Sequence, residues 1–179
     1  MNQTLVASYL VASMLFFADP ADASSSKPQY YTAKGKRLPK HTDVFISGED
    51  GYHTYRIPSV ITTLKGTLLA FCEGRKFSRR DQSPTDMVFK RSFDGGENWT
   101  SMQVVVKAVP DAAMDPCPVV DQTTGTIWLI YDRWPEGYKG REIKGFGMDA
   151  VTTWETHSTD DGATWSEPSN ITKMTKKPD

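Results

Sequence analysis

The stretch that decides the fold is "SFDGGENW", residues 92–99, because the chain repeats it as "STDDGATW" at residues 158–165. Both copies follow the pattern S-x-D-x-G-x-[TN]-W. The Asp can accept hydrogen bonds from backbone amides of the turn that it opens, the Gly can supply a positive φ, and the Trp can tuck beneath the turn as an anchor. The repeat therefore predicts two hairpin turns of one design.

Short runs of β-branched and aromatic residues surround both turns, and no stretch shows sustained helical periodicity. The runs lie at residues 59–63, 67–73, 86–92, 102–106, 117–121, 126–134 and 150–158. Each turn precedes the last strand of a unit of about four strands. The turns open at Ser92 and Ser158, 66 positions apart, a little above the roughly 40–50 residues of common propeller repeats. The sequence predicts an all-β fold made of about two propeller blades.

The composition is that of a globular domain, with 38% hydrophobic and 24% charged residues in a chain of 179. A formal net charge of −1 provides no basic surface that would bind nucleic acid or an anionic membrane. The two cysteines, Cys72 and Cys117, form no disulfide framework, and we expect both to be small buried hydrophobic residues. No Cys/His cluster has the spacing of a metal site, so no cofactor is expected.

The N-terminal region resembles a secretory signal peptide. Its apolar run at residues 5–18 is too short to span a bilayer, and a small-x-small cleavage pattern follows at residues 21–23. The first residues carry no Lys or Arg, so a disordered N-terminus stays an alternative. We expect a signal peptide at 1–23, a polar linker at 24–41 and the propeller domain at 42–179. The protein would then be secreted, or enter the periplasm or a lysosomal lumen, with no stable membrane insertion.

One arginine stands in an unusual local setting. Arg56 lies in "YRIP", residues 55–58, directly before an Ile-Pro pair and a β-branched run. Pro58 and that run would fix the backbone around it. A guanidinium that is held in place is a candidate anion clamp, and the alternative is an ordinary salt bridge at a strand end.

Five motifs in this order resemble the exo-α-sialidases, or neuraminidases, whose propellers carry the Asp-box (BNR) repeat. They are "YRIP" at 55–58, "LLAFCEGR" at 68–75, "DMVFKRSFDGGENW" at 86–99, "MDP" at 114–116 and "STDDGATW" at 158–165. The resemblance covers about residues 42–166. It implies a β-propeller of the sialidase type, which has six blades in complete members. This chain would be an N-terminal fragment with about the first two blades.

The resemblance implies that Arg56 is one of three arginines that bind the carboxylate of sialic acid. It also implies that Arg75, in "EGR", is the second arginine of the site, which lies near the carboxylate and the O4 side of the sugar. The planar guanidinium fits a carboxylate bidentately, which explains Arg rather than Lys. Glu73 points to the same side of its predicted strand as Arg75, where it either orients an arginine or is an ordinary surface acid.

The resemblance implies that Asp81 is the catalytic acid. It lies six residues after Arg75 in the loop "KFSRRDQSPTD", where bacterial-type members place this residue. A carboxyl group over the pocket can protonate the departing glycosidic oxygen and later deprotonate the incoming water. Asp86 is the rival, although its position directly before "MVFKRS" indicates the start of the third strand.

Three more residues are candidates for substrate binding. Asp115 resembles the family aspartate at the start of the second blade, which contacts the N-acyl or glycerol side of the substrate, with Met114 lining the pocket. Asp-Pro also favours turn initiation, so a turn role for Asp115 stays open. Trp134 can form an apolar wall for the acyl group or cap a blade edge.

The implied function is that of a glycoside hydrolase that removes terminal α-linked sialic acids from glycoproteins, glycolipids and oligosaccharides with retention of configuration. Sialidases use a tyrosine nucleophile, which the family places later in the chain with its glutamate and the remaining arginines. Residues 167–179 supply none of these, and Tyr52, Tyr55, Tyr131 and Tyr138 are not in that context. We therefore expect this chain to be inactive alone. A non-catalytic Asp-box binding module and a sialic-acid lectin are the alternatives.

Overall fold

The computed structural model describes residues 4–6, 41–81, 83–137 and 145–177. Within them it contains ten strands and one short helix. The strands are β1 (Thr4–Val6), β2 (Asp43–Ile46), β3 (Thr54–Thr62), β4 (Leu68–Arg75), β5 (Thr85–Ser92), β6 (Gln103–Val106), β7 (Ala112–Val120), β8 (Ile127–Trp134), β9 (Thr152–Ser158) and β10 (Ser169–Asn170), and the helix is α1 (Thr172–Thr175). This confirms the all-β prediction. Of the predicted signal peptide, only β1 belongs to the described residues, and its pairing with β2 does not test that prediction.

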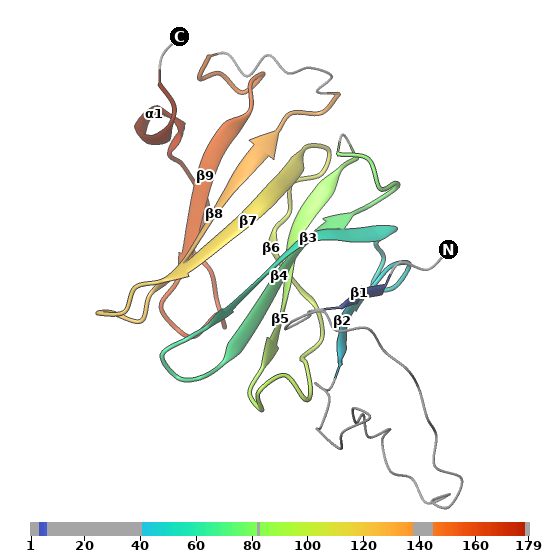
Figure 1. The fold of residues 1–179 in the computed structure, drawn as a ribbon. Helices are drawn as coiled ribbons and strands as arrows, with labels where there is room; N and C mark the ends of the chain where they lie inside the picture. Colours follow the sequence, from blue (N-terminus) through green and yellow to red (C-terminus); the bar gives the residue numbers. More distant parts are fainter. Residues whose placement is uncertain (1–3, 7–40, 82, 138–144, 178–179) are drawn as a thin grey trace, which may run out of the picture.

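Two antiparallel units of four strands make up the described sheet (Figure 1). Blade 1 consists of β3, β4, β5 and β6, and blade 2 consists of β7, β8, β9 and β10. A single parallel pair, Thr85 with Ala112, joins β5 to β7. The sheet stays open within the described residues. The seven predicted runs all fall on strands, while β1, β2 and β10 were not predicted.

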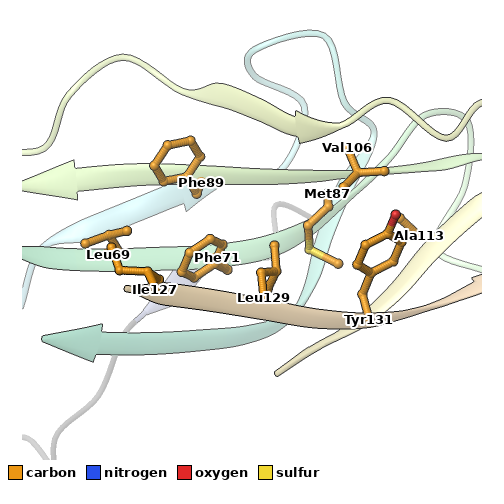
Figure 2. Packing of buried hydrophobic residues seen from close by; sticks show 9 residues of the cluster. All are labelled: Leu69, Phe71, Met87, Phe89, Val106, Ala113, Ile127, Leu129 and Tyr131. Carbon is orange, nitrogen blue, oxygen red and sulfur yellow. The ribbon is translucent and has the colours of Figure 1, made fainter. Parts of the chain in front are cut away.

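The main hydrophobic core lies between the two blades (Figure 2). Its residues alternate along their strands, so that one face of each blade points to the other. Blade 1 contributes Leu69, Phe71, Met87, Phe89 and Val106, and blade 2 contributes Ala113, Ile127, Leu129 and Tyr131. The rings of Phe71 and Phe89 stack with their centroids 5.5 Å apart. Each fully buried large side chain stabilises the fold by roughly 1.5–3 kcal/mol, so this core fixes how the blades meet.

A second core covers the opposite face of blade 1. Phe45 of β2 packs against Tyr55 with ring centroids 5.2 Å apart, and Tyr52 lies 5.7 Å from Tyr55. Cys72 is fully buried in this core, as predicted. The prediction for Cys117 is wrong, because that residue is exposed. Cys117 lies opposite Ile130, which is also exposed and lies on the face of blade 2 turned away from the main core.

The two Asp boxes form the predicted turns, after β5 and after β9. In the first, the amide of Gly96 donates to Ser92 Oγ at 2.8 Å, Ser92 Oγ donates to Asp94 Oδ1 at 2.8 Å, and the amide of Asn98 donates to the same oxygen at 2.9 Å. The second box repeats these bonds at 2.9, 2.8 and 2.8 Å with Gly162, Ser158, Asp160 and Thr164. Gly96 has a φ of 91°, which explains the glycine at this position.

Candidate active site

The first strand of each blade carries the same irregularity. The register with the neighbouring strand shifts between residues 56 and 59 in β3 and between residues 114 and 117 in β7. Ile57 has a φ of 52° and Asp115 a φ of 55°, and a proline follows each. Proline has no N–H to offer a sheet ladder, so a bulge is where it fits. Asp115 therefore lies inside a strand, at a bulge that redirects its side chain, and not in a turn before the strand.

Arg75 ends β4 and is completely buried. Its Nε and Nη2 donate to Glu73 Oε2 at 2.9 and 2.5 Å, which confirms that the two side chains share one side of the strand. Glu73 is buried as well, so it is not a surface acid. Burial raises the pKa of Glu73, while the Asp115 amide and the Arg75 guanidinium act in the opposite direction. The guanidinium of Arg75 is thus held in one orientation.

Glu73 also joins the two blades. Its second carboxylate oxygen, Oε1, accepts a hydrogen bond of 3.0 Å from the backbone amide of Asp115. This residue belongs to the bulge of β7, so one carboxylate fixes both the arginine of blade 1 and the backbone of blade 2. No sequence pattern pointed to this bond, because its partners are 42 positions apart.

Asp81 brings the two predicted arginines together. Its Oδ1 accepts a hydrogen bond from Arg56 Nη1 at 2.9 Å and another from Arg75 Nη1 at 2.8 Å. The carbonyl oxygen of Arg79 accepts a further bond from Arg75 Nη1 at 2.6 Å, which ties the loop after β4 to the same guanidinium. Arg56 and Asp81 remain 42% and 50% exposed at their side chains, whereas Arg75 is 1% exposed. The cluster therefore joins one half-exposed guanidinium, that of Arg56, and one buried guanidinium, that of Arg75, through a single accessible carboxylate.

Asp86 has a different environment. It lies at the start of β5, as predicted, and is buried. Its Oδ2 accepts a hydrogen bond from the Tyr52 hydroxyl at 2.8 Å and pairs with Lys76 at 3.3 Å, and its Oδ1 accepts the amide of Ala108 at 3.0 Å. Because both of its carboxylate oxygens have partners, Asp86 has a structural role. Of the two rival aspartates, Asp81 is the accessible one.

Blade 2 supplies the remaining candidates. Met114 is buried in β7, Asp115 is exposed, and Trp134 is partly buried at the end of β8. Their roles in substrate binding stay predictions. Asp132, which sequence reasoning missed, lies opposite Met114 and accepts a bond from Thr153 Oγ1 at 3.1 Å. Burial raises the pKa of Asp132, and the charge of Asp115 adds to this effect.

The tyrosines that the structure describes in the two blades are engaged elsewhere. The Tyr52 hydroxyl donates to Asp86, and the Tyr55 hydroxyl donates to the Glu49 carbonyl at 3.0 Å. Burial raises the pKa of both, and that of Tyr131 to about 12. Tyr138 lies outside the described residues. In the part of the chain that is described, no three His, Cys, Asp or Glu side chains gather as metal ligands, and no helix is long and apolar enough to cross a membrane.

Comparison with known proteins places the chain in a family. Residues 66–178 match the model of the BNR repeat-like domain. An exo-alpha-sialidase from Arthroderma benhamiae is 33% identical over 190 residues, which cover 97% of this chain and 46% of that protein. The chain belongs to the BNR-repeat family of exo-α-sialidases. A second sialidase, from Micromonospora viridifaciens, is 32% identical over 185 residues, which cover 97% of this chain and 28% of that protein. The chain thus spans less than half of the length of either sialidase.

Solved sialidase structures have the same fold. The Hadza microbial sialidase Hz136 superposes with a TM-score of 0.68 at 32% sequence identity, over 80% of this chain and 32% of that one. The NanB sialidase from Streptococcus pneumoniae superposes with a TM-score of 0.62 at 13% identity, over 71% of this chain and 37% of that one. The second likeness concerns the fold alone. The blades described above are therefore sialidase β-propeller blades.

Proposed function

We propose that this chain supplies the carboxylate-binding and acid/base part of an exo-α-sialidase site. The protein would hydrolyse terminal α-linked sialic acids of glycoproteins, glycolipids and oligosaccharides with retention of configuration. The observation that carries the proposal is the convergence of Arg56 and Arg75 on one carboxylate oxygen at an accessible edge of blade 1. The names of the similar proteins, exo-alpha-sialidase and sialidase, support it.

The arginine pair would orient the sugar by its carboxylate. Guanidinium groups bind carboxylates through charge-assisted hydrogen bonds, which are about twice as strong as neutral ones. Arg75 is held by Glu73 before any ligand arrives, so little side-chain freedom is lost on binding. A sialic acid carries its carboxylate on the anomeric carbon, and fixing that group therefore fixes the reacting centre.

Asp81 would act as the acid and then as the base. In the first step it gives its proton to the glycosidic oxygen as the bond to the anomeric carbon breaks. In the second step it takes a proton from the water that attacks the same carbon, which restores the acid. Its exposure and its place beside the carboxylate-binding pair suit both steps. The nucleophile on the opposite face is assigned to no described residue, because Tyr52, Tyr55 and Tyr131 are buried.

A binding module or a lectin is the second candidate function. The Asp-box turns suit it equally well, since they only stabilise the blades. An accessible aspartate beside the arginine pair favours the enzyme, because a lectin has no use for a proton donor. Product release from a sialylated oligosaccharide separates the two classes.

The proposal is tested by how strongly the rate loss caused by Asp81→Ala depends on the leaving group of the substrate. In the full-length protein, we expect this variant to slow hydrolysis of a natural sialoside by ~10²–10⁴-fold, as is usual for a lost general acid. The defect should shrink for an aryl sialoside, whose leaving group needs little protonation. Proton NMR of the first-released sugar should show the α-anomer. An initial β-anomer contradicts retention, and equal defects on both substrates contradict the acid role of Asp81.

Export of the protein is a further part of the proposal, and it rests on the apolar run at residues 5–18 and the cleavage pattern that follows. N-terminal sequencing of the mature protein should begin at Ser24. A mature protein that still begins at Met1 contradicts it.

A further inference from the structure

We propose that Asp81 is an internal ligand of the arginine pair, and that a substrate carboxylate binds by displacing the Asp81 carboxylate from Arg56 and Arg75. This inference rests on the proposed function and adds a competition step to it. Without ligand, the site is occupied by its own acid. With ligand, the sugar carboxylate takes that place and the acid is released.

The geometry that carries the inference is the sharing of a single oxygen. Asp81 Oδ1 lies 2.9 Å from Arg56 Nη1 and 2.8 Å from Arg75 Nη1. Two guanidinium groups of like charge that approach one point need an anion between them. The Asp81 carboxylate fills this role with the same chemical group that a sialic acid would bring. Internal and external ligands therefore compete for the same donors.

The two sides of the cluster differ in how firmly they are held. Arg75 is 1% exposed, and its Nε and Nη2 bond Glu73 while only its Nη1 bonds Asp81. Asp81 is 50% exposed, so water can receive its carboxylate when it leaves. The exchange replaces one carboxylate by another and preserves the charge and the hydrogen bonds around the guanidinium groups. Releasing Asp81 from the two arginines still costs free energy. The apparent Kd is therefore the intrinsic Kd divided by the fraction of the protein in which the arginine pair is free.

Displacement would also make catalysis depend on the carboxylate of the substrate. A carboxylate that bridges two guanidinium groups only accepts hydrogen bonds and has no proton to give. Asp81 can protonate the glycosidic oxygen only after its carboxylate leaves Arg56 and Arg75 and takes up a proton from water. A sugar without a carboxylate would leave Asp81 in place, so the same contact selects acidic sugars.

The experiment measures binding of 2,3-didehydro-2-deoxy-N-acetylneuraminic acid, which has the carboxylate but no leaving group, to the full-length protein by titration calorimetry. Asp81→Asn removes the internal charge and should bind this probe about 5–10-fold more tightly than the unchanged protein. Asp81→Ala should show a similar gain. The gain should shrink when Arg56→Met is added, because one of the two contested donors is then missing.

The matched control is Asp50→Asn. Asp50 is 42% exposed and pairs with Lys90 at 3.3 Å, so its substitution removes the same charge from another exposed ion pair. The affinity of the Asp50→Asn variant for the probe should stay within about twofold of that of the unchanged protein. The methyl ester of the probe, which lacks the negative charge, should bind Asp81→Asn no more tightly than it binds the unchanged protein. Unchanged or weaker binding by both Asp81 variants, beside normal binding by the unchanged protein, overturns this inference alone. No binding by any of these proteins overturns the proposed function and the inference with it.

Discussion

The two blades share one frame and place different side chains on it. In blade 1, Arg56 lies opposite Glu73, and in blade 2, Met114 lies opposite Asp132. Each of the strands β3 and β7 has a bulge that contains a proline, and each pairs antiparallel with the strand that follows it in the sequence. The backbone is therefore repeated while the chemistry is not. The arginine cluster belongs to blade 1 because its matched positions hold arginine, and not because its fold differs.

The blades also differ in what their Asp boxes contact. The second box is fastened to blade 1, where Thr67 Oγ1 donates to Asp161 Oδ2 at 2.6 Å. Trp165 meets both Phe71 and Phe89 edge-on, with ring centroids 5.7 Å apart. Trp99 of the first box instead packs on the second core and donates to the Gly96 carbonyl of its own turn at 3.2 Å. Both Asp boxes thus close a turn within their own blade. Among the described residues, only the second box also contacts the other blade.

The largest effect is expected at the buried ion pair of blade 1. Arg75→Met leaves Glu73 buried without its guanidinium, and removing one partner of a buried pair typically costs about 3–5 kcal/mol. Urea unfolding should show this loss in the free energy of unfolding. Trp134→Met, at the matched position of blade 2, should cost less, because tryptophan carries no charge and its replacement breaks no ion pair.

A double variant sharpens this test. Replacing Glu73 by Leu in the Arg75→Met background removes the orphaned carboxylate and should recover part of the loss. A double variant that is less stable than Arg75→Met would show that the bond from the Asp115 amide to Glu73, and not the ion pair, carries the stability.

The second effect concerns the two tryptophans. Trp165→Ala removes two edge-to-face ring contacts and opens a cavity at the interface between the blades, so we expect a loss of about 2–4 kcal/mol. Trp99→Ala should cost less, since Trp99 has no such ring pair with the residues that the structure describes. Denaturant unfolding of both variants gives the comparison, and equal losses would mean that the tryptophans act only within their own turns.

The features that could be predicted from the sequence depend on short segments of chain. The Asp-box bonds join residues at most four positions apart, so the pattern of Ser, Asp and Gly is sufficient to predict them. The strands follow from their β-branched runs for the same reason. Arg75 and Glu73 on one face follow from the period of two along a strand.

What could not be predicted depends on contacts between distant segments. The positive φ of Asp115 is uncommon outside glycine and occurs at the bulge of β7, where the Asp115 amide bonds Glu73 of blade 1. The burial of Asp86 arises from Tyr52 and Ala108, which come from two other parts of the chain. The convergence of Arg56 and Arg75 on Asp81 was available only through the family resemblance, which implied one shared site but not one shared oxygen.

The third effect tests the charged chemistry of blade 1 at its exposed arginine. Arg56→Lys keeps the charge but loses the planar fork, and it should weaken binding of a sialic acid analogue by roughly 1.5–3 kcal/mol, the worth of a hydrogen bond between charged groups. Arg80→Lys is the control, because it makes the same exchange at an exposed residue of the neighbouring loop. Calorimetric titration checks both. Equal affinities for Arg56→Lys and the unchanged protein would return Arg56 to the role of an ordinary salt bridge.

The smallest effect concerns the feature that the blades share most closely. Hydrogen bonds, first among them those from Asn98 in one box and Thr164 in the other, lower the pKa of Asp94 and of Asp160 to about 2. An unfolded aspartate titrates near 3.9, so both carboxylates stabilise the folded state above about pH 4, and this stabilisation is lost as the pH falls through about 2. Both groups are exposed, so water screens the effect and it stays small.

Asp94→Asn and Asp160→Asn should each flatten the fall of the free energy of unfolding between about pH 4 and pH 2, and to a similar degree. Glu136→Gln, an exposed acid outside the boxes, should leave that fall unchanged. Urea unfolding at a series of pH values provides the measurement. If only Asp160→Asn flattens the curve, the acid sensitivity comes from the lock between the blades, since Asp161 of the same box holds Thr67 of blade 1. Equal flattening means that each turn titrates by itself, and the difference between the blades then lies in their tryptophans and arginines alone.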